Sequence, residues 1–241
     1  MRIGSILLLR GLHCIQSESW KIYRPLGNLK RCLDALSELE CDEVAVINVT
    51  RGPESIGDDI LQNDILKQSL MCSTPISFGG GLRSLYDLEK VSNLPIERIC
   101  LSSAFINGNE PLLEYAVKQF GRQAVQCVLP FRYCDKTATF ELFCSEENIF
   151  IPFNPEIMCL INSYANEVIF YDTSAEGLYN SFNWKILEQI DYPFDKTIIS
   201  GGIGLEIINQ AKKMGLAAVL IDNSSLHFEM NFSKAKRYAD L

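Results

Sequence analysis

The sequence predicts a single (β/α)8 TIM barrel, an α/β fold in which eight parallel strands close into a ring inside a layer of helices. Short apolar runs alternate with helix-like segments along the 241 residues, and this alternation is typical of a parallel sheet. A glycine-rich motif also occurs twice, half a chain length apart. We therefore expect one domain, residues 1–241, with a two-fold repeat of half-barrels at about residues 1–121 and 122–241. An open, doubly wound sheet is the alternative, which the halving of the chain disfavours.

The repeated motif combines a glycine turn with a small polar pair further along. Its copies begin as Ser77–Leu82 and Ile199–Gly204, and the second follows the first by 121 residues. The matched pairs are Gly80-Gly81 with Gly201-Gly202, and Ser102-Ser103 with Asn223-Ser224. Glycine lets a backbone approach a ligand closely, and the helix starts after such turns offer free N–H groups to a phosphate. The motif predicts two phosphate sites. The alternative is that the glycines only turn a strand into a helix.

The strands are expected where short apolar runs allow burial on both faces, as in a parallel sheet. They are Ile3–Leu9, Val44–Val49, Pro75–Phe78, Arg98–Leu101, Ala124–Leu129, Glu167–Tyr171, Thr197–Ser200 and Ala218–Asp222. Residues 10–26 are expected to form a long polar loop, and Thr137–Phe143 a small hairpin in the fifth loop.

The helices are expected where apolar residues recur at helical spacing. Asn28 is the expected cap of the first, which presents Leu29, Cys32, Leu33 and Leu36 on one face and ends at Leu39. The others are Asp59–Leu70, Ser84–Val91, Glu110–Gln119, Glu156–Tyr164, Trp184–Ile190, Leu205–Met214 and Ser233–Ala239.

The composition limits the classes of partner. The net charge of −8 argues against general binding to nucleic acid or to an anionic membrane. Nine cysteines without a C-x-x-C pair favour reduced thiols in a cytoplasmic protein, and two histidines make a His-based metal site improbable. The apolar run Ile3–Leu9 is too short to span a membrane or to be a convincing signal peptide. We expect no metal and no cofactor.

Charged residues mark the two ends of the expected barrel. Glu43 and Glu167 begin strands two and six, and Arg2 and Arg98 begin strands one and four. Because strand starts lie at the floor of such a barrel, these four side chains are candidates for a charged ring there. The alternative is ordinary solvated strand ends.

Candidate chemistry lies at the opposite end, where barrel enzymes hold their active sites. Asp172 and Asp222 end strands six and eight, and either is a candidate general acid or base. The alternative for both is a hydrogen bond that caps a loop or helix. Arg10 and Arg132 follow strands one and five, so they are candidates to bind a pyrophosphate or carboxylate, unless they are solvated loop residues.

Several of these segments together resemble the cyclase subunit of imidazole glycerol phosphate synthase. The landmarks are Arg2-Ile3, Asp42-Glu43, Gly79–Gly81, Ser102–Ala104, Phe120–Ala124, Glu176-Gly177, Ser200–Gly202, Ser224 and His227-Phe228. The resemblance implies a barrel of the ribulose-phosphate-binding type that forms a heterodimer with a glutaminase subunit docked at its floor. Ammonia would cross the barrel to a phosphorylated substrate at the top, where the family works as a lyase and cyclase in histidine biosynthesis. Leu7–Arg10 resembles a paralogous branch encoded with surface-polysaccharide (LPS) genes and implicated in amidating a nucleotide-linked sugar.

The resemblance assigns roles to single residues of this chain. It implies one phosphate site at Gly81, Ser102 and Ser103, and another at Gly177, Gly202, Asn223 and Ser224. It implies an ammonia gate of Arg2, Glu43, Arg98 and Glu167, with Arg98 in place of a lysine, and a glutaminase contact at Glu97.

Several positions depart from the family pattern. Leu8 and Pro130 stand where the family has its acid/base aspartates, Gln16 replaces a lysine, Asn48 replaces one aspartate and Glu176 another. Because losing one acid or base costs about 10²–10⁴-fold in rate, the parent cyclisation is expected to be weak or absent. We expect an ammonia-receiving enzyme subunit acting on a phosphorylated or nucleotide-linked sugar. The alternatives are a non-catalytic scaffold that docks a glutaminase or senses a phosphorylated metabolite, and a sugar-phosphate isomerase of the sister family.

Overall fold

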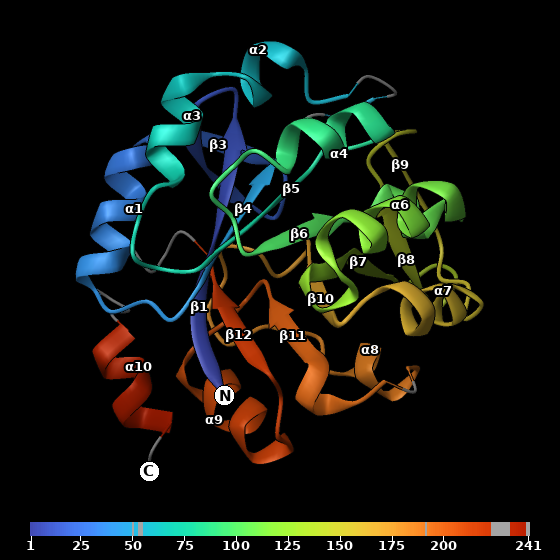
Figure 1. Ribbon diagram of the computed structural model, residues 1–241. Coiled ribbons are helices and arrows are strands. Elements are labelled where there is room, and N and C mark those ends of the chain that lie inside the picture. The colour runs from blue at the N-terminus through green and yellow to red at the C-terminus, as the bar shows by residue number, and fades with distance from the viewer. Residues whose placement is uncertain (50, 53–54, 191, 223–231, 240–241) are drawn as a thin grey trace.

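The computed structural model describes the chain except residues 50, 53–54, 191, 223–231 and 240–241. Its centre is a closed ring of eight parallel strands, in the order β1, β4, β5, β6, β7, β10, β11, β12 and back to β1 (Figure 1). Their bounds are β1 Arg2–Arg10, β4 Val44–Asn48, β5 Ile76–Gly79, β6 Arg98–Leu101, β7 Val125–Cys134, β10 Glu167–Asp172, β11 Thr197–Ser200 and β12 Ala218–Ile221. The prediction of a (β/α)8 barrel is confirmed.

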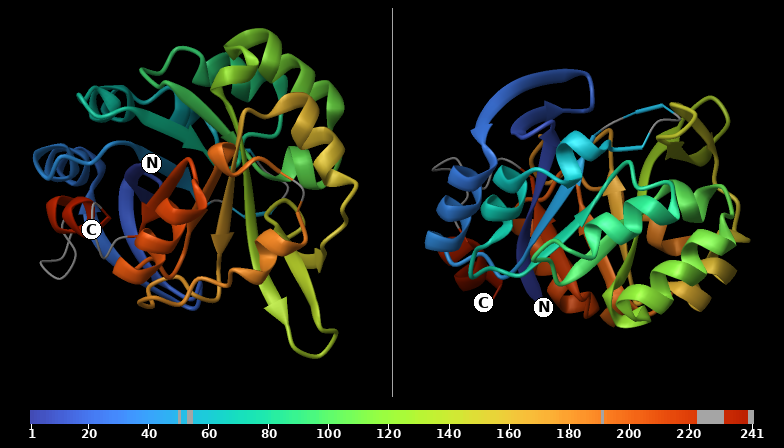
Figure 2. Two further views of the ribbon diagram at one scale, coloured as in Figure 1. Left: turned by 90° about the horizontal axis from the view of Figure 1, so that it is seen from below. Right: turned by 45° about the horizontal axis from the view of Figure 1, so that its top comes forward.

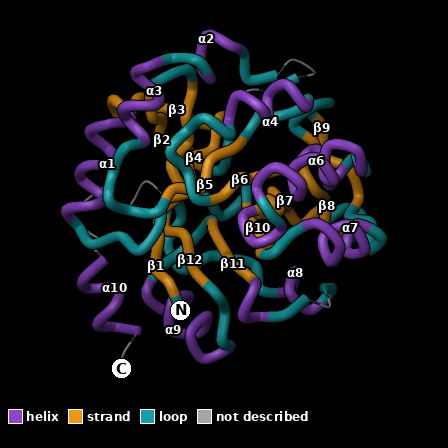
Figure 3. Tube along the Cα trace, viewed as in Figure 1, coloured by secondary structure: helices purple, strands orange, loops and turns teal. Residues whose placement is uncertain are grey.

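Helices cover the outside of the ring, as Figure 3 shows in purple around the orange strands. Their bounds are α1 Leu29–Glu38, α2 Asp58–Leu61, α3 Asp64–Leu70, α4 Leu85–Val91, α5 Ser103–Ile106, α6 Glu110–Phe120, α7 Ile157–Tyr164, α8 Lys185–Glu188, α9 Leu205–Met214 and α10 Phe232–Ala239, with short 3-10 turns η1 Arg122–Ala124 and η2 Phe194–Lys196. Asn28 caps α1 by accepting a hydrogen bond from the Lys30 backbone N–H, as predicted. No helix in the described ranges is both long and apolar enough to cross a membrane.

The expected helix over residues 59–70 is two helices in the structure, because Asn63 starts a new one. Its side chain accepts a hydrogen bond from the Ile65 backbone N–H at 2.9 Å, which is the bond of an N-cap. The chain therefore ends α2 at Leu61 and begins α3 at Asp64.

The expected polar loop over residues 10–26 is wrong. These residues form an antiparallel hairpin of β2 His13–Glu18 and β3 Ile22–Asn28, and β2 pairs with the end of β1. One face of this hairpin is solvated, so its polar side chains are compatible with strands. Ser19 and Trp20 form its turn, both with positive φ.

A second hairpin follows the fifth barrel strand. It pairs the end of β7 with β8 Thr139–Cys144, which confirms the expected hairpin, and it continues into a further strand, β9 Ile149–Pro152. Figure 2 shows the blue β2–β3 hairpin and the olive β8–β9 strands rising at the same end of the barrel, where the parallel strands end. That end is called the mouth below, and the end with the strand starts is called the floor.

Two matching contacts relate the halves of the barrel. A Cβ added at Gly80 would lie 2.0 Å from the carbonyl oxygen of Asn48, and one added at Gly201 would lie 2.2 Å from that of Asp172. In both halves a glycine turn thus packs on the end of the preceding barrel strand, β4 for Gly80 and β10 for Gly201. The division near residue 121 remains a prediction.

Candidate functional site

The mouth of the barrel holds a small, mostly apolar cavity of about 70 Å³. Its lining residues include Leu8, Trp20, Ile47, Asn48, Arg51, Gly80, Cys100, Ser102, Val128, Pro130, Phe143, Ser145 and Tyr171. Pockets that hold drug-sized ligands measure roughly 300–1,000 Å³. The cavity as it stands is therefore too small for a ligand with a phosphate at each end.

Trp20 closes much of this mouth. It lies at the turn of the β2–β3 hairpin, and its ring meets Phe143 of β8 and Tyr171 of β10 edge-on, with centroids 5.0 and 5.7 Å apart. Both distances are within the range of favourable aromatic pairs. One side chain thus joins the two hairpins and the barrel.

Arg51 lies in the same aromatic cluster. Its guanidinium carbon is 5.1 Å from the ring centroids of both Trp20 and Phe143, and its Nη2 donates a hydrogen bond to the hydroxyl of Tyr23 at 2.7 Å. Cation–π contacts of this kind fix the position of a guanidinium that would otherwise move freely.

The first expected phosphate site borders the cavity. Ser102 lines it, and its buried Oγ has no hydrogen-bond partner among the described residues. The hydroxyl of Ser103 is 2.9 Å from that of Ser145, in the turn after β8, and the Gly81 carbonyl accepts from the Ile56 backbone N–H. The structure thus places Ser102 and Gly80, the neighbour of Gly81, on one cavity, with the Ser102 hydroxyl unpaired among the described residues.

In the described part of the second expected phosphate site, the loop after β10 packs against Gly202 and the start of α9. Asn180 and Tyr179 accept hydrogen bonds from the first backbone N–H groups of α9, those of Glu206 and Leu205. The Ser181 backbone N–H donates to the Gly202 carbonyl, and a Cβ at Gly202 would lie 2.5 Å from the Ser181 hydroxyl. Asn223 and Ser224 lie outside the described residues.

The two candidate acid/base residues hold loops in place. Asp172 is buried and accepts hydrogen bonds from the backbone N–H groups of Ser174, Ala175 and Asn183, at 3.0–3.1 Å. Asp222 is buried too, and its Oδ2 accepts from the Gly177 N–H at 2.8 Å. These are the loop-capping contacts of the alternative interpretation. Burial raises the pKa of Asp172, and the three backbone donors offset part of that rise.

Glu176 is a buried carboxylate bound to Trp20 and Tyr171, two of the residues that line the mouth. It is 1% exposed and accepts hydrogen bonds from the hydroxyls of Ser17, at 2.5 Å, and of Tyr171. The backbone N–H of Trp20 adds a third, longer bond at 3.3 Å. Burial raises the pKa of Glu176, an effect that these donors only partly oppose. Glu176 thus ties the β2–β3 hairpin to β10.

Arg10 and Arg132 do not form the expected pair. Arg132 is bound by Glu141 on the neighbouring strand at 2.7 Å and lies 3.8 Å above the ring of Phe150. Arg10 is exposed and instead borders a separate groove together with Arg51.

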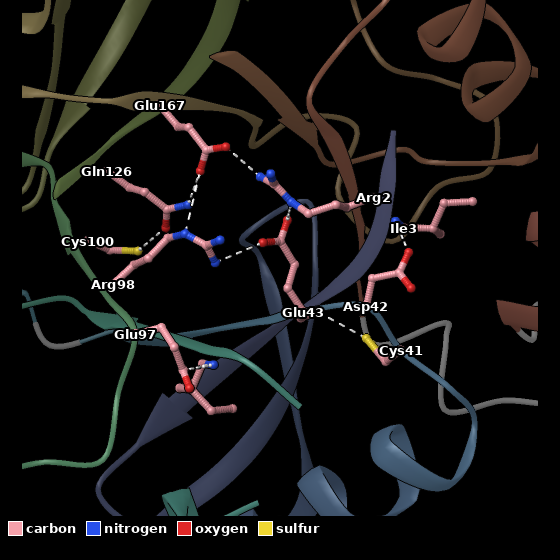
Figure 4. Close-up of polar contacts among 11 residues, drawn as sticks. Arg2, Ile3, Cys41, Asp42, Glu43, Glu97, Arg98, Cys100, Gln126 and Glu167 are labelled. Carbon is pink, nitrogen blue, oxygen red and sulfur yellow. Dashed lines mark hydrogen bonds and ion pairs between the residues drawn. The ribbon is translucent and has the colours of Figure 1, made fainter. Parts of the chain in front are cut away.

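The floor holds a ring of four charged side chains from four strands (Figure 4). Arg2 contacts Glu43 at 3.1 Å and Glu167 at 2.6 Å. Arg98 contacts the same two carboxylates at 3.2 and 3.8 Å. Both glutamates are buried, so the expected alternative of solvated strand ends does not describe them.

The pKa values of Glu43 and Arg2 in this ring are both raised, but for different reasons. Burial raises the pKa of Glu43 although Arg2 and Arg98 oppose the rise. Burial lowers the pKa of Arg2, but Glu43 and Glu167 outweigh this and leave it above its ordinary value. Gln126 donates a hydrogen bond to Glu167 at 2.8 Å, and Cys100 lies next to Gln126 on the mouth side of the ring.

Glu97, the expected contact for a glutaminase, is exposed. It accepts a hydrogen bond from the Ile76 backbone N–H at 2.6 Å, as Figure 4 also shows.

Sequence reasoning did not foresee Trp20, Tyr171 and Phe143 as lining residues of the mouth. A tryptophan in a polar segment was the only available signal for Trp20. Tyr171 and Phe143 look like ordinary strand residues, because their direction depends on the register of the closed barrel.

The fold defines the chain as a (β/α)8 barrel with a charged ring at its floor and a small cavity at its mouth, and comparison with known proteins identifies its family. Residues 13–231 match the family model described as histidine biosynthesis protein, and the chain belongs to this family. It is 23% identical over 230 residues to the imidazole glycerol phosphate synthase subunit HisF of Staphylococcus aureus, covering 91% of this chain and 90% of that protein. The corresponding subunit of Azobacteroides pseudotrichonymphae is 27% identical over 181 residues, which cover 72% of this chain and 70% of that one. A Campylobacter jejuni protein assigned as subunit hisF2 is 25% identical over 126 residues, and here the chain spans about half of its relative, 49%.

Proposed function

We propose that this chain is a divergent cyclase-type subunit that receives ammonia from a glutaminase partner and transfers it to a phosphorylated or nucleotide-linked sugar. The observation that carries this proposal is the floor ring of Arg2, Glu43, Arg98 and Glu167, considered together with the family. Two buried carboxylates at strand starts cost desolvation energy even when they are paired with partly exposed arginines, and a chain that needed only stability would gain as much from apolar residues. A functional role explains their presence.

In this proposal the ring acts as the ammonia gate. A small neutral molecule that enters at the floor meets paired charges first, and it then meets Gln126 and Cys100 on the inner face of the barrel. The glutaminase docks around this ring, with Glu97 at the contact.

At the mouth, the proposal requires orientation and anion binding, and not the parent acid/base chemistry. Leu8 and Pro130 cannot transfer a proton, so cyclisation of the ribulosyl phosphate is weak or absent. In this proposal Gly81, Ser102 and Ser103 bind a phosphate of the ligand, and the unpaired Ser102 hydroxyl at the cavity supports that role. The segment Leu7–Arg10, which resembles the surface-polysaccharide branch, is the feature of this chain that favours a sugar-nucleotide acceptor.

A non-catalytic scaffold is the second candidate. It is favoured by the closed mouth, where Trp20 covers a cavity of about 70 Å³, and by the self-capped second site. In that role the chain docks and activates a glutaminase or senses a phosphorylated metabolite.

The test of partner binding is glutamine hydrolysis by a glutaminase subunit from the same organism, measured with and without the chain. We expect the chain to raise the turnover, and Arg98→Glu to remove that effect because it places a third carboxylate in the ring. Arg132→Gln, at the mouth, is the matched control and should keep it. Equal turnover with and without the chain would refute the docking role.

The enzyme and the scaffold are then separated by incubating the complex with glutamine and either the ribulosyl phosphate or a sugar nucleotide. Mass spectrometry detects transfer of nitrogen when the glutamine amide carries ¹⁵N. A labelled sugar product supports the enzyme, whereas stimulated hydrolysis with release of all label as ammonia supports the scaffold.

A further inference from the structure

A second hollow lies beside the cavity at the mouth, and two arginines border it. This groove has a volume of about 400 Å³ and is lined by Arg10, Ile15, Tyr23, Val49 and Arg51. Tyr23, Val49 and Arg51 also line the smaller cavity, so the two hollows adjoin. The groove has enough room for a ligand group that the cavity cannot hold.

Strand register explains why both arginines border one groove. Leu8 of β1 is paired with Ile47 of β4, and both side chains belong to the layer inside the barrel. Arg10 lies two residues beyond Leu8 on β1, so strand alternation places it on the same inner side. The register also sets the end of β4 beside Leu9, next to Arg10, and Val49 and Arg51, which follow β4, line the same groove. On β2, Ile15 is paired with Leu8 and extends this face.

None of the described residues neutralises the positive charge of the groove. Within the described ranges, no carboxylate forms an ion pair with Arg10 or Arg51, although the protein carries a net charge of −8. The nearby buried carboxylate of Glu176 is already engaged by Ser17, Tyr171 and Trp20. Arg51 is also held in place by Trp20 and Phe143. Pre-positioned guanidinium groups lose little freedom when they bind an oxyanion.

We propose that the Arg10–Arg51 groove is an anion site that binds a phosphate-type oxyanion, with a diphosphate as the best fit. The two guanidinium groups that border the groove can each donate a pair of N–H groups, and a diphosphate offers oxygens to both. A single carboxylate has only two oxygens, too few for two such pairs. This site rests on the proposed function only in naming the bound anion as part of a substrate, because the binding itself requires no partner and no catalysis.

The fluorescence of Trp20 can report on binding in this groove. The chain has two tryptophans, Trp20 and Trp184, so a Trp184→Phe variant leaves the emission of Trp20 alone. Inorganic pyrophosphate is titrated into this variant at constant ionic strength, in parallel with orthophosphate and citrate. We expect saturable quenching or a spectral shift with pyrophosphate, with weaker binding of orthophosphate. Because these are ionic contacts, the affinity should fall as salt rises.

Four variants locate the site. Arg10→Gln and Arg51→Gln should each weaken pyrophosphate binding by roughly tenfold or more, as expected for loss of a charge-assisted pair. Arg51→Lys keeps the positive charge and loses the paired N–H groups of the guanidinium, so its affinity for pyrophosphate should be intermediate. Arg24→Gln is the matched control, because Arg24 neighbours Tyr23 on β3 but lies on the opposite face and should leave binding unchanged.

Isothermal titration of the same variants gives an independent measurement if Arg51→Gln alters the emission of Trp20 directly. Absence of pyrophosphate binding, equal affinity in all variants, or tighter binding of citrate than of pyrophosphate would each overturn the proposal. Stimulation of a glutaminase by a chain that binds no pyrophosphate would refute this site and leave the proposed partner intact. Pyrophosphate binding without stimulation of the glutaminase would support this site and refute the proposed partner.

Discussion

At the scale of single residues, Glu176 best shows how burial sets chemistry in this protein. Burial disfavours the charged form of its carboxylate and raises the pKa, and the three hydrogen-bond donors Ser17, Tyr171 and Trp20 offset only part of this rise. A raised pKa means that the folded chain binds the proton more tightly than the unfolded chain. The contribution of Glu176 to stability is therefore greatest at low pH and falls as the pH rises through the raised pKa.

Glu176→Gln tests this dependence. The amide cannot ionise, so the stability of the variant relative to the unmodified chain should improve steadily as the pH increases above about 4.5. Urea unfolding at several pH values between 4.5 and 8 measures the difference. Glu18→Gln, on the exposed face of the same hairpin, controls for the loss of one charge. A constant difference between Glu176→Gln and the unmodified chain at all pH values would contradict the prediction.

At the scale of elements, one glycine turn in each half-barrel packs closely against the end of a neighbouring strand. Gly80 has a φ of +94° and lies so near Asn48 that a Cβ would meet the carbonyl oxygen at 2.0 Å. Gly201 meets Asp172 in the same way in the other half. A side chain at either position combines strained backbone with a backbone clash that no rotamer relieves.

Gly80→Ala and Gly201→Ala should therefore each destabilise the fold by about 3 kcal/mol or more, since conformational strain alone accounts for about 1–3 kcal/mol. Gly108→Ala is the control, because its φ is +66° but the space around it is open. It should cost only about 1 kcal/mol. Thermal or chemical unfolding measures all three. Equal losses in the three variants would show that the clash is absent.

At the scale of the whole molecule, the floor ring connects β1, β4, β6 and β10 across the barrel. Glu43 is central to it, since it contacts both arginines and is itself 3% exposed. Arg2 and Arg98 are partly exposed, with 34% and 23% of their side chains accessible, so water screens part of the interaction.

Glu43→Gln should lower the free energy of unfolding by about 1–3 kcal/mol, because hydrogen bonds to a charged group are lost from a buried position. Asp42→Asn is the control at the same floor. Asp42 forms a half-exposed ion pair with Lys236, whose loss should cost less than about 1 kcal/mol. Chemical unfolding of both variants compares the two. A loss at Asp42→Asn as large as that at Glu43→Gln would mean that burial does not set the cost.

The sequence alone determined the barrel, the order of its strands and which residues stand at its floor, because apolar periodicity and strand starts are local properties of the chain. It also determined that Leu8 and Pro130 cannot act as acid or base. Only the tertiary structure decided that residues 10–26 form a hairpin, that Trp20 and Tyr171 close the mouth, and that Asn180 caps α9 at the second expected phosphate site. It also decided that Arg10 shares a groove with Arg51 and not with Arg132. These features depend on the register of a closed sheet and on contacts between segments far apart in sequence, and no local pattern encodes them.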